Sequence, residues 1–268
     1  MNIQAEVLAF GETERDFSEV DKVRVVEALS RVLPAGTLMY ETEDLRPYEC
    51  DGLAAYRALP LVVALPTTEE QVVAVLRTCF ELGVPVVARG AGTGLSGGAL
   101  PHTRGVLLSL ARFNRILKLD PLARTAVVQP GVRNLAISEV AAPHGLYYAP
   151  DPSSQIACSI GGNVAENAGG VHCLKYGLTV HNLLRVRGVT IDGEIVEIGS
   201  GALDAPGYDL LALVTGSEGM LVVLTEVTVK LVPKPQLAQC VLAAFDDVVR
   251  AGDAVAKIIA AGIIPAGL

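Results

Sequence analysis

The sequence predicts an α+β fold. One β-α-β unit is legible between residues 61 and 88, and from residue 105 to 233 the chain runs mainly from strand to strand with few helices. Apolar residues make up 51% of the 268 residues, which is enough for a substantial core.

Residues 1–50 are predicted to form a helical lead. One helical stripe of the segment 18–33 consists of Val23, Val26, Leu29 and Leu33. Pro34 ends this helix, and the segment 46–60 that follows is rich in turn residues and predicts a loop.

A β-α-β unit begins with a short apolar strand at 61–65. Thr67 and Glu70 form a capping box that starts the helix, and glycine and proline end it before a second strand at 84–88. The buried face of this helix is predicted to consist of Val72, Val73, Leu76 and Phe80. We expect the two strands to form a parallel pair.

Further strands and one clear helix, at 132–142, follow this unit. An Asp-Gly pair at 192–193 between two alternating runs predicts a β-hairpin. The expected strands are 105–110, 115–120, 125–131, 183–191, 194–199 and 221–233. The central domain then spans 51–233, with two subdomains of about 51–120 and 121–233.

Pro233 and Pro235 predict a domain boundary. Beyond them the sequence predicts a strand at 237–245 and a helix at 246–261. One strand and one helix cannot bury both their faces, so we expect residues 234–268 to be the incomplete start of a further domain.

Composition narrows the function classes. The net charge is −8 and no run is rich in Lys or Arg, which argues against a nucleic-acid partner. The N-terminus lacks the features of a secretory signal, and the apolar run 258–268 is too short to span a bilayer, so we expect a cytoplasmic protein. The five cysteines include no C-x-x-C pair and are expected to be reduced thiols.

Residues 89–98 read RGAGTGLSGG and contain a G-x-G-x-x-G pattern. In a Rossmann fold this pattern opens a helix that crosses to a parallel strand. Here only about seven residues, a proline among them, separate Gly98 from the next strand, so a crossover helix does not fit. The sequence therefore argues against a Rossmann nucleotide site.

The five glycines of this loop suit a different kind of nucleotide site. Glycine lets successive N–H groups converge on an anion without any helix, and a diphosphate fits such a nest. The alternative is a tight surface loop, which one or two glycines would satisfy. Ordering five glycines costs more backbone entropy than a plain turn requires, so we favour a ligand.

A second glycine-rich stretch spans residues 150–170. Its residues are small and carry amides and hydroxyls, so a flat aromatic ligand with a ribityl or ribose chain could lie against the backbone. Alternatively, small residues there permit tight packing of two subdomains.

Three motifs, in this order, resemble one family. They read PVVARGAGTGLSGGAL, then PDPSSQIACSIGGNVAENAGG with a following KYG, then TGSEGMLVVLTEVTV. They are similar to FAD-linked oxidases and dehydrogenases of the vanillyl-alcohol oxidase type, which share the FAD-binding domain of p-cresol methylhydroxylase. Within that family the chain most resembles the glycolate oxidase D-subunit and D-lactate dehydrogenases.

The resemblance implies a two-lobed α+β FAD-binding domain of the p-cresol methylhydroxylase type over 51–233, plus the start of a truncated substrate (cap) domain. FAD would lie extended between the lobes. For the pyrophosphate the implied residues are Arg89, Gly90, Ala91, Gly92, Thr93, Gly94, Leu95 and Ser96. For the ribityl chain and isoalloxazine they are Asp151, Pro152, Ser154, Gly161, Gly162, Asn163, Ala165, Asn167, Gly169 and Gly170, and for the adenosine end Glu218, Gly219 and Val223.

Three departures from the family pattern matter. Thr93 stands where many relatives carry the His that links FAD covalently, so we expect noncovalent FAD. Cys158 lies one position from a second covalent link of some relatives and is expected to serve packing. The chain reads E-G-M-L-V at 218–222 where the family has E-G-T-L-G, which affects the adenine contacts.

The resemblance also implies oxidation of a D-2-hydroxy acid, glycolate or D-lactate, to the 2-oxo acid. Electrons would pass to a partner or a quinone rather than NAD. The reaction needs a base for the hydroxyl proton and cations for the carboxylate. In this family they come largely from the substrate domain, so we assign no catalytic residue and no metal site. Local candidates near the flavin are His172, Lys175, Tyr176 and His181, for each of which a structural or surface role is the simpler interpretation.

The implied partners are a small-molecule 2-hydroxy acid and further subunits that bind FAD and an iron–sulfur cluster, through which the protein would sit peripherally at the inner membrane. Two alternatives stay open. The chain could be a cofactor-binding module without turnover, or it could serve another reaction on the same fold, as in alditol and phenol oxidases or an ether-lipid synthase.

Overall fold

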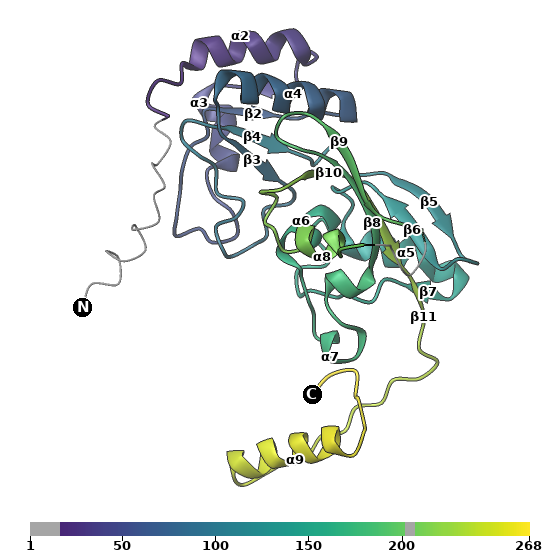
Figure 1. Cartoon of the computed structure of the whole chain (residues 1–268). Coiled ribbons are helices and arrows are strands. Elements are labelled where there is room, and N and C mark those ends of the chain that lie inside the picture. The colour runs from purple at the N-terminus through teal and green to yellow at the C-terminus, as the bar shows by residue number, and fades with distance from the viewer. Residues whose placement is uncertain (1–16, 202–206) are drawn as a thin grey trace.

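Two sheets, each with its own helices, divide the chain into an upper and a lower lobe in Figure 1. The computed structural model describes residues 17–201 and 207–268. The first sheet has the strand order β1-β2-β4-β3, the second has the order β5-β6-β10-β8-β9, and β11 pairs with β7 in a small third sheet. The α+β class predicted from the sequence is confirmed.

The two lobes follow each other along the chain: the upper lobe is the first, N-terminal lobe, and the lower lobe is the second. The first contains α2 (Lys22–Val32), β1 (Leu38–Met39), α3 (Thr42–Leu45), η1 (Arg46–Tyr48), β2 (Val62–Ala64), α4 (Glu69–Leu82), β3 (Val86–Arg89) and β4 (Val106–Ser109). The second begins with β5 (Ile116–Asp120), β6 (Thr125–Val128), α5 (Asn134–Ala141), η2 (Ala142–His144), β7 (Leu146–Tyr147), α6 (Ile160–Glu166), α7 (Cys173–Tyr176) and η3 (Thr179–Asn182). It ends with β8 (Leu183–Val189), β9 (Ile195–Gly199), α8 (Leu210–Val214), β10 (Val223–Lys230) and β11 (Val232–Pro233), and α9 (Val248–Ala260) follows.

The first sheet is buried on both faces. Side chains alternate along a strand, so Val62 and Ala64 face the core that α2 and α4 cover, while Val63 packs with Leu45 of α3 on the other face. This explains why the strands read as unbroken apolar runs rather than alternating ones.

The parallel pairing in this sheet is confirmed, but the strand order differs from the expectation. β4 lies between β2 and β3 and is parallel to both, so the two strands of the β-α-β unit are not direct neighbours. β1, which the sequence analysis did not predict, adds an antiparallel edge beside β2.

Helix α4 begins one residue later than predicted. Its N-cap is Thr68, whose hydroxyl accepts a hydrogen bond from the Gln71 amide, whereas the Thr67 amide donates to the Gln71 side chain. The predicted capping box on Thr67 was therefore wrong by one position, because Thr68 holds the extended φ and ψ that an N-cap requires. Gly83 ends the helix in the left-handed conformation, as predicted.

The second sheet is antiparallel, and β10 lies between β6 and β8. The predicted hairpin joins β8 to β9, with Gly193 at a φ of 82° in its turn. Val189 at the end of β8 and Val223 at the start of β10 pack into the core of the first lobe, although the rest of their strands serves the second core. The two lobes therefore share an apolar contact beside α4.

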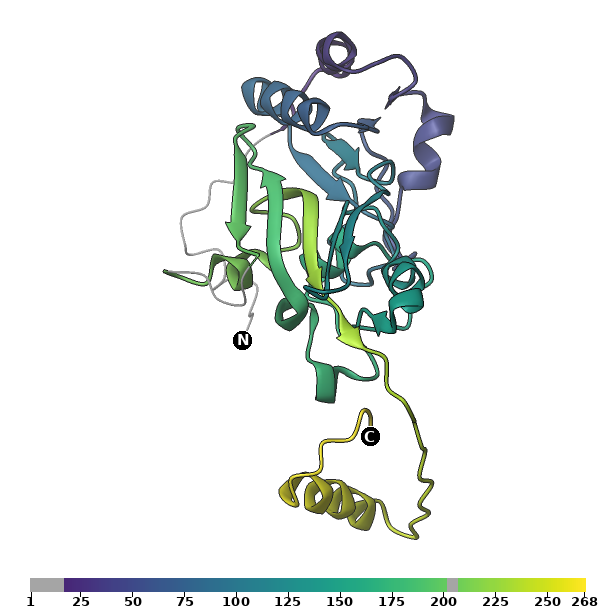
Figure 2. The same ribbon diagram turned by 90° about the vertical axis from the view of Figure 1, so that its right-hand side faces the viewer.

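For the chain beyond Pro233, the predicted helix is confirmed and the predicted strand is wrong. Helix α9 begins after its N-cap Asp247, and Figures 1 and 2 show it apart from both lobes at the end of an extended segment. Residues 237–245, predicted as a strand, are irregular. A strand requires a partner for its N–H and C=O groups, and residues 237–245 pair with no strand of the three sheets. The domain boundaries at 50, 120 and 233 stay predictions.

Candidate functional site

The glycine loop between the lobes connects two parallel neighbours without a helix. It leaves β3 at Arg89 and reaches β4 at Val106, and residues 90–105 contain only turns, bends and irregular backbone. The absence of a Rossmann helix in these described residues agrees with the sequence analysis. The loop nevertheless crosses to a parallel neighbour, and it does so as irregular backbone.

The second glycine stretch is helical in part, which the sequence analysis missed. Ser159 is the N-cap of α6, and its hydroxyl accepts a hydrogen bond from the Gly162 amide. Asn167 ends the helix in the left-handed conformation, at a φ of 49°. The signal was present as a Ser and an Asn at the two ends of IGGNVAE, but the two glycines inside obscured it.

The glycine loop runs along α6 from its first turn to its last. The Ala91 amide donates to Ser159 Oγ at 3.3 Å, and a side chain at Gly90 would collide with the same hydroxyl. Further on, a Cβ at Gly94 would lie 3.7 Å from Glu166 Oε1. Loop and helix therefore approach so closely at Gly90 that only glycine fits there.

Buried Asp51 fixes the far part of the loop. Its Oδ2 accepts from the Gly97 amide at 3.1 Å, and its Oδ1 accepts from the Leu53 amide at 2.8 Å. The following Gly52 has no room for a side chain, because a Cβ would lie 2.8 Å from the carbonyl oxygens of Thr93 and Gly94. The sequence predicts only a loop for this segment.

A cavity of about 400 Å³ lies between this loop, α6 and the start of β10. It brings together most of the residues named from the sequence. The predicted residues that line it are Arg89, Gly90, Ala91, Gly92, Thr93, Gly94, Leu95, Ser96, Pro152, Ser154, Gly161, Gly162, Asn163, Ala165, Glu218, Gly219 and Val223. Segments more than a hundred positions apart in the chain thus share one site.

Four predicted residues do not line the cavity and hold the neighbouring backbone instead. Asn167 caps α6 and accepts from the Val180 amide, and a Cβ at Gly169 would press on Leu178. Asp151 binds His172 through its side chain, and Gly170 lies so close to Asp151 that a side chain would collide with it. Their small or polar character serves local packing.

The cavity also has lining residues that were not assigned to the cofactor from the sequence. They are Ala88, Gly98, Ala99, Leu110, Pro130, Ser153, Cys158, Ser159, Val164, Glu166, Ala168, Val214, Ser217, Val222 and Leu224. Several are apolar strand residues, which sequence periodicity assigns to the core. Cys158, expected to serve packing, is buried and lines the wall, and burial raises the pKa of its thiol.

Arg89 places a positive charge beneath the glycine loop. Its guanidinium donates to the carbonyl oxygens of Tyr48 and Cys50 at 3.2 and 2.7 Å. No carboxylate among the described residues lies within ion-pair distance of it, so its charge is only partly offset, and burial lowers its pKa. The positive charge therefore favours an anion over Gly92, which packs directly on the guanidinium.

The opposite part of the loop meets carboxylates. Glu166 and Glu218 both approach Gly98, where a Cβ would lie 3.1 and 2.8 Å from their oxygens. Burial, followed by the charges of Glu218 and Asp51, raises the pKa of Glu166. This end of the cavity suits hydroxyl or amino groups, which donate hydrogen bonds, rather than phosphate.

One donor in the cavity wall is unsatisfied. Among the described residues, Asn163 is almost completely buried, and its Nδ2 has no hydrogen-bond partner. An orphaned buried donor costs free energy unless a ligand or water accepts from it. The wall of the cavity thus contains backbone, small side chains and one free amide donor.

The local candidates for chemistry lie outside this wall. His172 and Lys175 are exposed, with His172 Nδ1 2.5 Å from Asp151 Oδ2 and the Lys175 ammonium 5.6 Å from the ring centroid of Tyr176. His181 accepts from the Leu178 amide through Nδ1. Within residues 17–201 and 207–268, no group of three metal-ligating side chains is present.

Comparison with known proteins identifies the fold. A family model described as an FAD binding domain matches residues 60–199, which is more than half of the chain. The chain belongs to this family of FAD-binding domains. FAD is therefore the cofactor of this fold, in agreement with the two glycine segments.

Two relatives illustrate the relationship of this FAD-binding domain. The glycolate oxidase subunit GlcD of Escherichia coli (strain K12) is 66% identical over 250 residues, which cover 93% of this chain and 50% of that protein. The D-lactate dehydrogenase of Anaerostipes hadrus is 38% identical over 214 residues, which cover 79% of this chain and 45% of that protein. The chain spans about half the length of both relatives.

Comparison with solved structures agrees with this family assignment at the level of the fold. The solved structure of an alkyldihydroxyacetonephosphate synthase matches this FAD-binding domain with a TM-score of 0.78 at 22% identity, covering 91% of this chain and 47% of that one. At this identity the match shows the fold alone, which is the two-lobed arrangement expected from the sequence.

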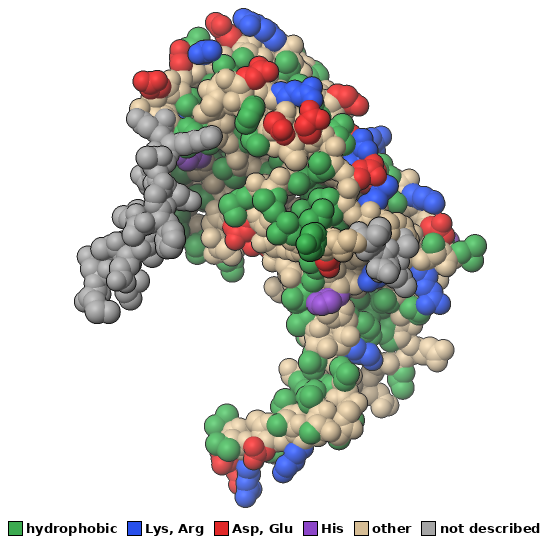
Figure 3. All heavy atoms as spheres, in the orientation of Figure 1, with side chains coloured by type: hydrophobic (Ala, Val, Ile, Leu, Met, Phe, Trp, Pro, Cys, Tyr) green, Lys and Arg blue, Asp and Glu red, His purple; other side chains and the backbone are tan. Residues whose placement is uncertain are grey.

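The surface of this FAD-binding domain carries charges of both signs. Figure 3 shows acidic and basic side chains intermixed over the upper lobe and the edge of the second sheet, without a broad basic area on that face.

None of the helices that the structure describes is long and apolar enough to cross a membrane.

The residues present fit FAD. Gly90 and Gly92 leave backbone amides without side chains above the Arg89 charge, which suits a diphosphate. Asn163 offers an unpaired donor, and Glu166 and Glu218 offer acceptors for hydroxyl or amino groups. A dinucleotide with a diphosphate between two hydroxyl-bearing arms matches this order of charges.

Proposed function

We propose that this chain is the FAD-binding part of an enzyme that oxidises a D-2-hydroxy acid, glycolate or D-lactate, to the 2-oxo acid. The observation that carries the proposal is the convergence of the two glycine segments and the TGSEG segment on one cavity in a chain 66% identical to a glycolate oxidase subunit. Because the chain spans about half of that relative, the activity is proposed for the whole protein.

The loop Gly90–Ser96 would hold the diphosphate, chiefly at Gly90–Gly92, where Arg89 lies beneath the backbone. Pro152, Ser154 and the first turns of α6 would line the ribityl chain and the isoalloxazine. Glu218, Gly219 and Val223 would meet the adenosine end. Asp151, Asn167, Gly169 and Gly170, which lie behind this wall, would support it rather than touch the cofactor.

Bound FAD would accept the hydride from the α-carbon of the hydroxy acid. The residues of this chain would orient the cofactor and exclude water along its length, since the cavity wall is mostly small and apolar. Among the described residues, no His or Lys lines the cavity, so the group that takes the hydroxyl proton is not assigned to this chain.

That last observation favours a second candidate function, a cofactor-binding module without turnover of its own. The two candidates differ in one assay: D-lactate or glycolate is added to the FAD-loaded chain with an artificial electron-accepting dye. Reduction of the dye by the chain would rule out the hypothesis of a module without turnover. That hypothesis would be supported if the full-length protein reduced the dye and the 268-residue chain did not.

The proposed electron acceptor is a partner protein or a quinone. The name of the Escherichia coli relative describes it as a subunit, so we propose that this protein also works with further subunits, one of them carrying an iron–sulfur cluster. Through them it would act in the cytoplasm at the inner membrane. Co-purification of the tagged full-length protein, followed by iron analysis, tests this arrangement.

A further inference from the structure

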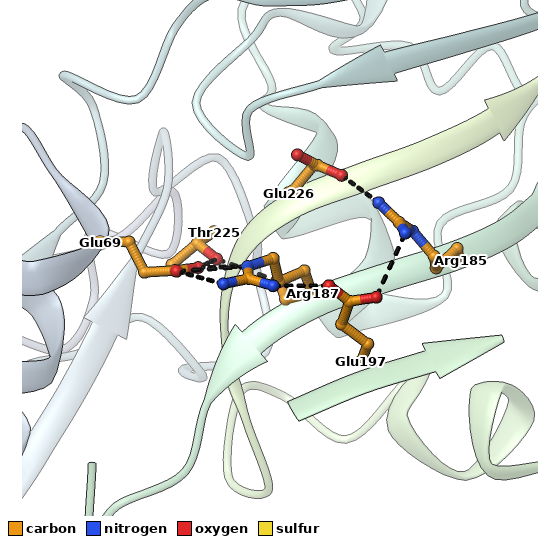
Figure 4. A network of polar contacts seen from close by, with 6 residues as sticks. All are labelled: Glu69, Arg185, Arg187, Glu197, Thr225 and Glu226. Carbon is orange, nitrogen blue, oxygen red and sulfur yellow. Dashed lines mark hydrogen bonds and ion pairs between the residues drawn. The ribbon is translucent and has the colours of Figure 1, made fainter. Parts of the chain in front are cut away.

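A charged contact joins the two lobes (Figure 4). Glu69 lies in the first turn of α4 in the upper lobe, and Arg187 lies on β8 in the lower lobe. The guanidinium binds the carboxylate with two groups, Nε to Oε2 at 2.9 Å and Nη2 to Oε1 at 2.8 Å. Such a bidentate pair fixes direction as well as distance.

Thr225 completes this contact from β10. Its hydroxyl donates to Glu69 Oε2 at 2.6 Å. The register between β10 and β8 shifts between Leu224 and Glu226, so Thr225 occupies a β-bulge. A bulge redirects a side chain, and here it aims a buried hydroxyl at the other lobe.

The same strand links this contact to the cavity. Val223 and Leu224 line the cavity, and Thr225 is the next residue of β10. On the upper lobe, α4 leads directly through Gly83 into β3, which delivers the glycine loop. Neither Glu69, Arg187 nor Thr225 lines the cavity, so their effect on a ligand must pass through the position of the lobes.

A second pair across the lobes is more exposed. Arg77 of α4 donates to Glu194 Oε1 at 3.1 Å and to the Gly193 carbonyl at 3.2 Å. The side chains of Arg77 and Glu194 are 52% and 69% exposed, against 32% and 20% for Arg187 and Glu69. Exposed pairs contribute little, so the inner pair is the principal charged contact.

Arg185 provides a matched control within the same network. It lies two residues from Arg187 on β8 and binds Glu197 and Glu226, both on the second sheet. Glu197 also binds Arg187. Both arginines thus carry the same charge in one network, but only Arg187 reaches the upper lobe.

We propose that Glu69, Arg187 and Thr225 form a latch that holds the two lobes at the separation FAD binding requires. They are positioning residues, because they act on the cofactor through α4 and β10. This inference rests on the proposed FAD site and adds a determinant of cofactor affinity that lies outside it.

The test is titration of the apo-form of the 268-residue chain with FAD, followed by flavin fluorescence, for wild type, Arg187→Gln and Arg185→Gln. Loss of the bidentate contact should weaken FAD binding about tenfold in Arg187→Gln. The FAD affinity of Arg185→Gln should stay within about twofold of wild type, because this variant keeps the contact between Glu69 and Arg187 that joins the lobes. Thermal unfolding of each apo-protein reports whether the variant is folded.

A double-mutant cycle separates a latch from general destabilisation. Glu69→Gln, Arg187→Gln and the double variant should weaken FAD binding to the same extent, since all three remove the same contact between Glu69 and Arg187. Additive losses, or equal affinities for Arg187→Gln and Arg185→Gln, would overturn the latch. If Arg187→Gln does not fold, Thr225→Val supplies the test, with a loss of about two- to fivefold expected for one hydroxyl donor. Failure of the wild type to bind FAD would instead refute the proposed function.

Discussion

Gly92 lies directly against the guanidinium of Arg89: a Cβ on Gly92 would stand 2.5 Å from Nη2 and 2.7 Å from Cζ. Gly92 also has a φ of 68°, which favours glycine. The residue at the centre of the proposed diphosphate site is thus glycine for two independent reasons, one steric and one conformational.

Gly92→Val should therefore lose FAD. The substitution displaces Arg89 and strains the loop, and we expect affinity to fall by about 2 kcal/mol or more, roughly 30-fold. Equilibrium dialysis against FAD measures this, with Gly97→Asn as control. Gly97 also has a positive φ, but a Cβ there meets nothing within 4 Å and the residue does not line the cavity. Equal losses in both variants would contradict the assignment of the site.

FAD should leave the protein on denaturation. Thr93 lines the cavity where many relatives carry a linking His, and a Thr side chain forms no such bond to the flavin. Precipitation of the FAD-loaded protein with acid, followed by absorbance of the supernatant and the pellet, checks this. All yellow colour is expected in the supernatant, and colour retained by washed pellet would refute noncovalent binding.

Glu166→Gln should stabilise the apo-protein at high pH. The pKa of Glu166 is raised above its ordinary value of 4.5, first by burial and then by Glu218 and Asp51. A carboxyl with a raised folded-state pKa destabilises the fold increasingly as pH rises from the unfolded-state pKa of 4.5 to the folded-state pKa, and the penalty is complete above the latter. It vanishes well below pH 4.5, where both states bind the proton. The melting temperature of the variant should exceed that of wild type at pH 8 and equal it at pH 4.

Glu81→Gln, which changes an exposed glutamate of α4, is the control for that comparison. A melting-temperature gain in Glu166→Gln that persists unchanged at pH 4 would show that the effect has another origin than the Glu166 proton.

The cysteines should differ sharply in reactivity. Burial raises the pKa of the Cys79 thiol to about 12, whereas Cys173 and Cys240 are exposed. Iodoacetamide at pH 8 should label Cys173 and Cys240 in the native protein and Cys79 only after unfolding, because the thiolate is the reacting form. Peptide mass spectrometry reads the sites. Rapid native labelling of Cys79 would mean that the core of the first lobe opens readily.

The local signals of the sequence located most of the secondary structure. The Asp192-Gly193 hairpin, the end of α4 at Gly83 and the helix after Asp247 each depend on residues adjacent to the feature they define. Such short-range chemistry is legible without a structure. The strand expected at 237–245 failed because a strand also needs a partner, which no local pattern reveals.

The glycines of the candidate site could be identified in the sequence, but the meeting of its carboxylates could not. Gly90 to Ser96, which the resemblance assigns to the pyrophosphate, line the cavity, and their binding role stays a prediction. Glu166 was missed because its meeting with Glu218 and Asp51 joins segments far apart in the chain. The bulge at Thr225 and its bond to Glu69 were equally hidden, since they depend on the register of β10 against β8 and on the placement of α4.

The apolar contribution of Val189 and Val223 to the first core has a consequence for biosynthesis. The N-terminal lobe ends its own strands by Ser109, yet its interior is incomplete until residue 223 has left the ribosome. During translation the nascent N-terminal lobe therefore lacks part of its apolar interior until β8 and β10 have emerged.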